Sequence, residues 1–112
     1  MGASWEGYAI EETLKVVRPE ASYFWATHIG AELDLLLVKG GRRYGVEVKR
    51  QDAPRLTPSM RIAHSDLRLQ RLTVLYPGDQ RYELDPRVAV VPLSELVTDP
   101  EVITRGKHTP GP

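Results

Sequence analysis

Two acidic residues and one lysine stand on either side of a paired-glycine turn. Asp34 precedes Gly40 and Gly41, and Glu47 and Lys49 follow them. Paired glycines supply the positive φ values that a two-residue hairpin loop requires, so the flanking segments are predicted to pair as antiparallel strands. Counting back from the turn places Asp34 directly opposite Glu47, and the alternation of side chains puts Lys49 on the same face of the hairpin.

Facing carboxylates need a positive charge nearby. The Cβ atoms of directly opposite residues lie roughly 5 Å apart, and like charges at that distance are destabilising. Lys49 could neutralise the pair, and so could a divalent ion, because Mg²⁺ is often held by one or two carboxylates together with water and phosphate. Glu6 falls on the apolar stripe of a predicted helix. Its carboxylate would join the other two if that helix packs on the polar face of the hairpin.

The alternative is that the same charged residues form ordinary ion pairs on the protein surface. Glu32 is predicted to lie opposite Lys49, so Glu32, Glu47 and Lys49 could form plain ion pairs on an exposed sheet face, each contributing at most about 1 kcal/mol. Leu36 and Val38 are predicted to share that face. Apolar neighbours indicate that another element covers the face, which favours a site.

The surrounding sequence predicts the elements that position these residues. Ser4 and Thr57 are candidate helix N-caps, and Pro58 suits the first position of the second helix. The strand, helix and strand that follow the glycine turn predict a right-handed crossover and a parallel pair. The expected helices are residues 4–17 and a second one from residue 58, and the expected strands are residues 22–27, 32–38, 43–49 and 71–76, with short ones near 82–84 and 88–91.

Strand alternation also predicts the buried face of the hairpin. Leu33, Leu35 and Leu37 should lie on one face, opposite the polar groups, together with the apolar residues of the partner strand. The 112 residues suit one domain, here residues 1–97. Residues 98–112, which are rich in Pro, Gly, Thr and charge, are expected to be a flexible C-terminal tail that adds little to the core.

Composition excludes several kinds of chemistry. The chain has no cysteine, which removes disulfides, thiolate zinc sites and cysteine nucleophiles. His28 and His64 lack a second ligand at metal spacing, and no serine has a recognisable histidine and acid partner. Apolar runs are far shorter than the roughly 20 residues of a membrane span, and no secretory signal is visible. We therefore expect no membrane partner and a cytoplasmic location.

Basic residues gather in the middle of the chain. The formal net charge is zero, with 15 basic and 15 acidic residues, but residues 39–71 hold nine basic and three acidic side chains. Such a basic segment can follow a phosphate backbone. The alternative is a set of arginines that are solvated on a helix and in loops.

The hairpin residues resemble the signature of the PD-(D/E)XK nuclease-like superfamily. That signature is an acid on one core strand, here Asp34, and an acid-x-lysine on the next, here Glu47-Val48-Lys49. No proline precedes Asp34, as in many members. More closely, residues 5–96 resemble an uncharacterised domain at the C-terminal end of a family of prokaryotic AAA-type ATPases, although the chain has no Gly-x-x-x-x-Gly-Lys-Ser/Thr loop. The shared phrases include Gly30-Ala31-Glu32-Leu33-Asp34-Leu35-Leu36, Gly45-Val46-Glu47-Val48-Lys49 and Val74-Leu75-Tyr76-Pro77-Gly78.

The resemblance implies an α/β fold with a restriction-endonuclease-like αβββαβ core, in which helices flank a mixed central sheet. It implies a metal-dependent nuclease that hydrolyses phosphodiester bonds, with Asp34 and Glu47 holding Mg²⁺ or Mn²⁺. Lys49 would orient water or stabilise charge, and Glu6 would assist the metal site. The expected partner is nucleic acid, foremost DNA, contacted through Arg50, Arg55, Arg61 and Arg68.

Two other functions stay open at this point. The domain could be a catalytically silent nuclease-like module that binds DNA or regulates a partner AAA-type ATPase. It could also be a homodimer that assembles through the apolar fifth strand, with Val88, Val90 and Val91, or through an exposed sheet edge.

Overall fold

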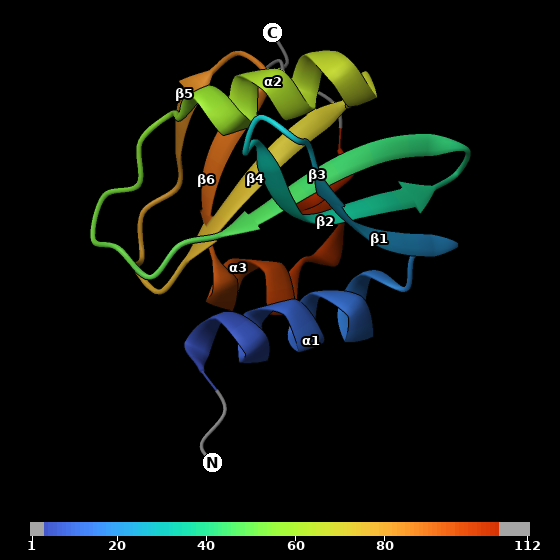
Figure 1. Ribbon diagram of the computed structural model, residues 1–112. Coiled ribbons are helices and arrows are strands. Elements are labelled where there is room, and N and C mark those ends of the chain that lie inside the picture. The colour runs from blue at the N-terminus through green and yellow to red at the C-terminus, as the bar shows by residue number, and fades with distance from the viewer. Residues whose placement is uncertain (1–3, 106–112) are drawn as a thin grey trace, which may run out of the picture.

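A six-stranded mixed sheet lies between two helical layers in the computed structural model, which describes residues 4–105 (Figure 1). The strand order is β1-β2-β3-β4-β6-β5. The fold is mixed α/β, and all the predicted helices and strands are present. The elements are α1 (Trp5–Val17), β1 (Ala21–Ala26), β2 (Glu32–Lys39), β3 (Arg42–Val48), α2 (Pro58–Leu67), β4 (Arg71–Tyr76), β5 (Tyr82–Asp85), β6 (Val88–Pro92), α3 (Leu93–Thr98) and the 3₁₀ helix η1 (Pro100–Ile103).

Both longer helices begin at the predicted caps. The Ser4 side chain accepts a hydrogen bond from the Gly7 amide at 3.0 Å, and the Thr57 side chain accepts one from the Met60 amide at 3.2 Å. These bonds satisfy amides that have no partner inside the helix. Within residues 4–105, none of the helices is long and apolar enough to cross a membrane.

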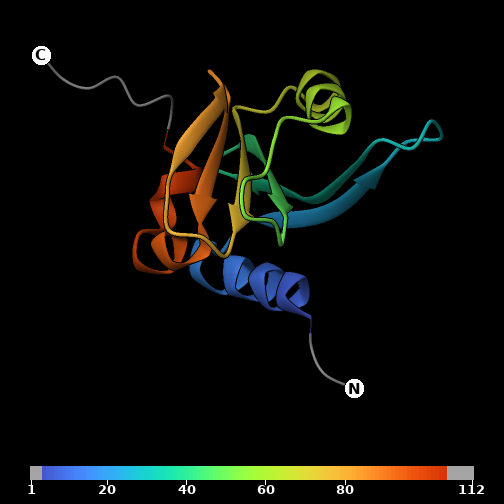
Figure 2. The same cartoon turned by 90° about the vertical axis from the view of Figure 1, so that its left-hand side faces the viewer.

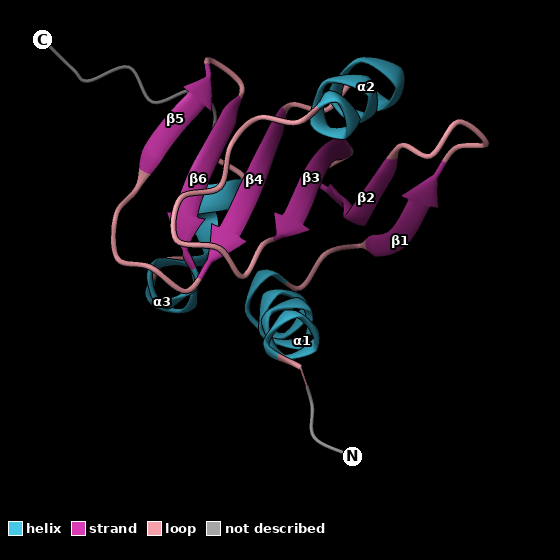
Figure 3. Cartoon of the chain, turned by 60° about the vertical axis from the view of Figure 1, so that its left-hand side comes forward, coloured by secondary structure: helices cyan, strands magenta, loops and turns pink. Residues whose placement is uncertain are grey.

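Strand pairing in the sheet changes from antiparallel to parallel at β3. The three strands β1, β2 and β3 form an antiparallel meander, and β3 pairs in parallel with β4 across the α2 crossover, which confirms the predicted parallel pair. Strand β4 is parallel to β6, and β5 is antiparallel to β6 (Figure 3). The segment with Val88, Val90 and Val91, expected as a fifth strand, is β6, and its backbone is hydrogen-bonded on both sides, so it offers no free edge to a second copy. The sheet edges are β1 and β5.

The two faces of the sheet carry separate cores. Helix α2 covers one face, and α1, α3 and η1 cover the other (Figures 1 and 2). On α1 the fully buried positions are Ala9, Thr13 and Val17, whereas Ile10 and Leu14 are only partly buried. The buried stripe is thus rotated by about one residue around the helix from the predicted apolar stripe, which contained Glu6.

A β-bulge in β2 changes which of its leucines share a face. Tyr23 of β1 pairs with Leu36, but Trp25, two residues on, pairs with Leu33. Strand β2 therefore holds one extra residue, and an extra residue reverses the alternation of side chains. As a result Leu33 packs in the α2-side core, while Leu35 and its neighbours toward the turn pack in the α1-side core. The expectation that all three leucines share one face was wrong for this reason.

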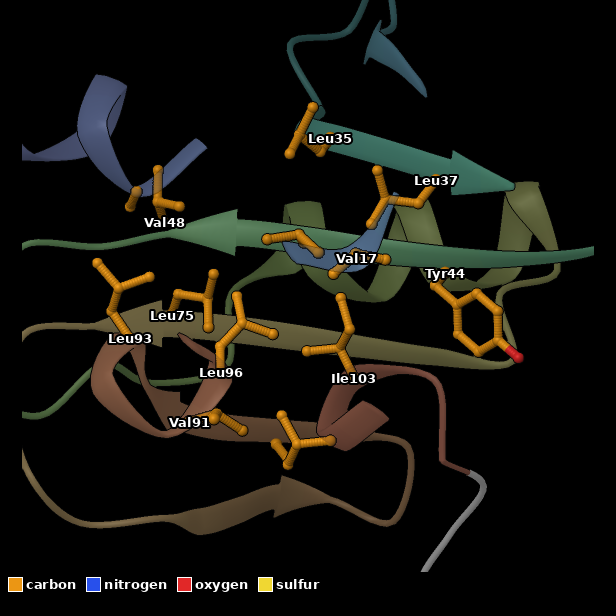
Figure 4. Packing of buried hydrophobic residues seen from close by; sticks show 14 residues of the cluster. Val17, Leu35, Leu37, Tyr44, Val48, Leu75, Val91, Leu93, Leu96 and Ile103 are labelled. Carbon is orange, nitrogen blue, oxygen red and sulfur yellow. The ribbon is translucent and has the colours of Figure 1, made fainter. Parts of the chain in front are cut away.

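The C-terminal segment contributes more than the sequence predicted. Val102 is 3% exposed and Ile103 is fully buried, and both pack with Leu96 and Val91 in the α1-side core (Figure 4). The expectation that residues from 98 onward add little to the core was therefore wrong for η1. The part of the predicted tail that follows Arg105 lies outside the described residues.

Removing the Ile103 side chain should test this packing. Ile103→Ala is expected to lower the free energy of unfolding by about 2 to 5 kcal/mol, because it leaves a cavity among groups that cannot all relax into it. Urea unfolding followed by tryptophan fluorescence measures the change. The matched control is Val97→Ala on the neighbouring helix, where the side chain is 40% exposed and the expected change is below about 0.5 kcal/mol. Equal effects of the two substitutions would contradict the role assigned to η1.

Candidate functional site

Strands β2 and β3 part at Asp34 and Glu47, and each carboxylate bonds to the opposite strand. The regular ladder ends with the pair Leu35 and Val46. One step beyond it, the Asp34 amide donates to Glu47 Oε1 at 2.8 Å, and the Val48 amide donates to Asp34 Oδ2 at 2.9 Å. The side chains thus replace backbone acceptors at the point where the bulge ends regular pairing. We call Asp34 and Glu47 the carboxylate pair.

Each member of the carboxylate pair keeps one oxygen outside these bonds. Glu47 Oε2 lies 3.7 Å from Lys49 Nζ, and Asp34 Oδ1 accepts no hydrogen bond from the described residues. The amide of Lys49 donates to the Leu75 carbonyl at 2.9 Å, which fixes the backbone of Lys49 beside β4. Glu32 is exposed and pairs with Ala26 of β1, and between residues 4 and 105 it forms no ion pair with Lys49.

Glu47 is buried because it continues an apolar face. It lies two residues after Gly45, on the same face of β3. A Cβ atom on Gly45 would come 2.6 Å from a Leu69 methyl and 3.3 Å from Leu33, so the leucines of the α2-side core fill the space over this glycine. Glu47 lies at the margin of that core and is 6% exposed.

Burial and a neighbouring charge make Glu47 a weak acid. The pKa of Glu47 is raised from 4.5 to about 7. Burial is the largest cause and the charge of Asp34 adds to it, while the hydrogen bond from the Asp34 amide and the charge of Lys49 partly oppose the rise. A carboxyl group with this pKa exchanges its proton near neutral pH. It can therefore act as a proton donor or acceptor, or release its proton to a cation.

Glu6 does not join the carboxylate pair. Helix α1 packs on the face of β3 that carries Val46 and Val48, which is the face opposite Glu47. The expectation that this helix covers the polar face was wrong, because the buried stripe of α1 meets the apolar face of the hairpin instead. The first turn of α1 does lie near the end of the sheet at which β3 and β4 finish, since Trp5 lines a hollow together with Pro77, which follows β4. Within residues 4–105, no three Asp, Glu or His side chains form a group that could hold a metal ion.

The four predicted phosphate contacts are all exposed. Arg50 and Arg55 lie in the connection between β3 and α2, and Arg61 and Arg68 lie on and just after α2. None of them forms an ion pair with another described residue. Their guanidinium groups are thus accessible to an anionic ligand.

Comparison of the sequence with known proteins assigns the chain to a family. Residues 1–96 match the model of a family described as a domain of unknown function, DUF4143. The chain belongs to the DUF4143 family. The match supports the resemblance to an uncharacterised domain.

The DUF4143 chain is also similar to two curated mycobacterial proteins. These are the uncharacterized protein Rv2008c of Mycobacterium tuberculosis and the uncharacterized protein Mb2031c of Mycobacterium bovis, each 43% identical over 98 residues. The aligned part covers 88% of this chain and 22% of each relative, so the chain spans about a fifth of their length. No solved structure matches the chain.

Sequence reasoning missed the backbone part of the site. The amides of Asp34 and Val48 hold the two carboxylates in place, and this depends on the bulge in β2. A bulge is a property of the pairing between β1 and β2, so counting from the β2–β3 turn alone could not reveal it.

The raised pKa of Glu47 predicts a specific dependence of stability on pH. Glu47 titrates near 4.5 when unfolded and near 7 when folded, so between these pH values the folded state binds more protons and the free energy of unfolding falls as pH rises. Glu47→Gln keeps the Oε1 acceptor but has no proton to lose. In EDTA it should match the parent near pH 4 and be more stable by up to about 3 kcal/mol at pH 8, at about 1.4 kcal/mol per pH unit.

Urea unfolding at several pH values measures this difference. The exposed Glu11→Gln on α1 is the matched control, and its difference from the parent should stay within about 0.5 kcal/mol at every pH. A Glu47→Gln difference that does not grow between pH 4 and pH 8 would refute the assignment.

Proposed function

We propose that this DUF4143 domain is a metal-dependent nuclease that hydrolyses phosphodiester bonds of nucleic acids. The observation that carries the proposal is the carboxylate pair, two acids held on facing strands with Lys49 Nζ 3.7 Å from Glu47 Oε2. Its residues are those of the acid and acid-x-lysine signature of PD-(D/E)XK nucleases. The element order α1, β1, β2, β3, α2, β4 is also the order expected of a restriction-endonuclease-like core.

The donor set fits a hard divalent cation. Asp34 Oδ1 and Glu47 Oε2 are the oxygens outside the backbone hydrogen bonds, and Mg²⁺ and Mn²⁺ prefer such carboxylate oxygens together with water and phosphate. The charge of Asp34 already raises the pKa of Glu47, so a cation between the two groups would relieve their repulsion. When bound, such an ion supplies charge neutralisation at the phosphate and lowers the pKa of water.

The protein groups around the pair have distinct tasks in this proposal. Asp34 and Glu47 hold the ion, and the backbone amides of Asp34 and Val48 keep both carboxylates oriented. The Lys49 side chain is 35% exposed, so its ammonium group can contact a phosphate oxygen that enters from solvent. There it stabilises the negative charge that develops during hydrolysis.

A catalytically silent module is the second candidate. The observation that favours it is that only two carboxylates meet in the described part of the chain, and that one of them is half protonated at neutral pH. In this case the fold is kept to bind DNA, or to regulate an AAA-type ATPase that is separate from or joined to this domain. The same basic residues would then serve binding alone.

Plasmid nicking separates the two functions. The purified chain is expected to convert supercoiled plasmid to the nicked form in Mg²⁺ or Mn²⁺ and to be inactive in EDTA. Lys49→Ala should slow this reaction by about 100-fold or more, a usual loss when one group that stabilises developing charge is removed. Lys15→Ala on the opposite side of the sheet is the control and should cut like the parent, because Lys15 is exposed and its ion-pair partner among the described residues is Glu12. Branched DNA extends the assay to structured substrates.

The outcomes are distinct. Cleavage by the parent and by Lys15→Ala, but not by Lys49→Ala, supports the nuclease. Cleavage by neither the parent nor any variant, with either ion and either substrate, would refute the nuclease proposal and favour the silent module.

A further inference from the structure

A groove rich in arginine lies between α2 and the turn that joins β5 to β6. Its larger hollow has a volume of about 620 Å³ and is lined by Arg68, Leu69 and Arg87, among others. A smaller hollow of about 130 Å³ is lined by Arg61. Both hollows are lined by His64, so they are neighbours along α2. Figure 3 shows α2 and the β5–β6 turn at the same end of the sheet.

The basic residues of α2 follow the groove. Arg61 and His64 are three residues apart and lie on one side of the helix, and Arg68 is the C-cap, with a left-handed backbone after the last turn. Arg61 lines one of the two adjoining hollows and Arg68 lines the other. Basic side chains spread over two adjoining hollows suit a ligand with several negative charges better than one small anion.

The arginines of the groove form no ion pairs with other described residues. Arg61, Arg68 and Arg87 are absent from the ion pairs of the described residues. Asp85 is the one carboxylate among the lining residues that the structure describes, and it accepts the Arg87 amide at 3.1 Å. The arginines thus outnumber the acids in the groove, and this favours an external anion.

A buried imidazole nitrogen also lacks a partner in this groove. His64 Nε2 is buried and makes no hydrogen bond with the described residues. Arg87 lines one hollow together with His64, and Asp85 lines the other. Burial lowers the pKa of His64, and the charge of Arg87 lowers it further, while the charge of Asp85 opposes this. A polar atom buried without a partner is costly, and a ligand at this position can provide one.

The loop after Lys49 connects the groove with the carboxylate pair. The Tyr82 hydroxyl donates to the Pro54 carbonyl at 2.9 Å, which fixes this loop beside β5. Leu56, near the end of the loop, lines the Arg61 end of the groove, and Arg50 and Arg55 precede it. Basic residues therefore extend from the candidate site to the far end of α2.

We propose that the groove formed by Arg61, His64, Arg68 and Arg87 binds consecutive phosphates of a nucleic acid backbone and leads the strand toward the carboxylate pair. The ligand class rests on the proposed nuclease function. Arg87 and His64 are new contact residues, and the binding is independent of base sequence because it involves phosphates.

Binding of a fluorescein-labelled 20-base-pair duplex, measured by fluorescence anisotropy in EDTA at several KCl concentrations, tests the groove without requiring cleavage. The variant is Arg68→Gln/Arg87→Gln, in which both side chains are exposed, so the fold should be kept, as thermal unfolding by circular dichroism can verify. The control is Lys15→Gln/Arg105→Gln, which removes the same charge from the α1 side of the sheet. Loss of two phosphate contacts should reduce the slope of log K against log salt by about 2 and weaken binding equally for unrelated sequences.

Each result has a defined meaning. A reduced slope in the groove variant, with the control at the parent value, supports the groove. A parent slope in the groove variant, an equal loss in the control, or no binding by the parent at low salt would overturn it. If the parent binds through the groove but does not nick DNA, the nuclease proposal fails and the groove stands; if the parent nicks DNA and the groove variant binds like the parent, the reverse holds.

Discussion

The extra residue in β2 is the constraint on which the rest of the site depends. A step of two residues along β1 matches a step of three along β2. Because of this mismatch the Leu33 side chain packs in the α2-side core, while Leu35 packs in the α1-side core. Just there the β2–β3 ladder stops, and the free amides of Asp34 and Val48 are satisfied by carboxylate oxygens from the facing strand. A regular ladder would have paired these amides with backbone carbonyls instead of carboxylates.

This geometry places two like charges together at the margin of an apolar core. The leucines over Gly45 remove water from Glu47, and Asp34 adds repulsion, so the folded protein holds a carboxyl group whose pKa is raised to about 7. Lys49, at 3.7 Å, offsets only part of that cost. A buried acid of this kind is rarely retained for stability alone, and a proton or a divalent cation is what removes the conflict. Stability and proposed chemistry thus depend on the same pair of side chains.

Features that depend on a few adjacent residues could be predicted from the sequence, whereas features that depend on pairing between distant segments could not. The glycine turn gave the β2–β3 register, and the caps at Ser4 and Thr57 gave both helix starts, because these features depend on a few adjacent residues. The bulge could not be predicted in this way, since it arises from the mismatch with β1. The face of the sheet that α1 covers follows from the small residues Ala9 and Thr13, which sequence periodicity ranked below the larger apolar ones. The burial of Val102 and Ile103 in η1 could likewise not be predicted, because these two apolar residues lie in a polar, proline-rich stretch of the sequence.

Calorimetric titration of Mn²⁺ at pH 7, repeated in buffers of different ionisation enthalpy, tests most directly whether the carboxylate pair is a metal site. Binding should release roughly half a proton for each ion, because Glu47 is about half protonated at that pH and must lose its proton to become a ligand. The Asp34→Ala/Glu47→Ala variant should show neither the binding nor the proton release. Unchanged metal affinity in that variant, or binding by the parent without proton release, would contradict the account.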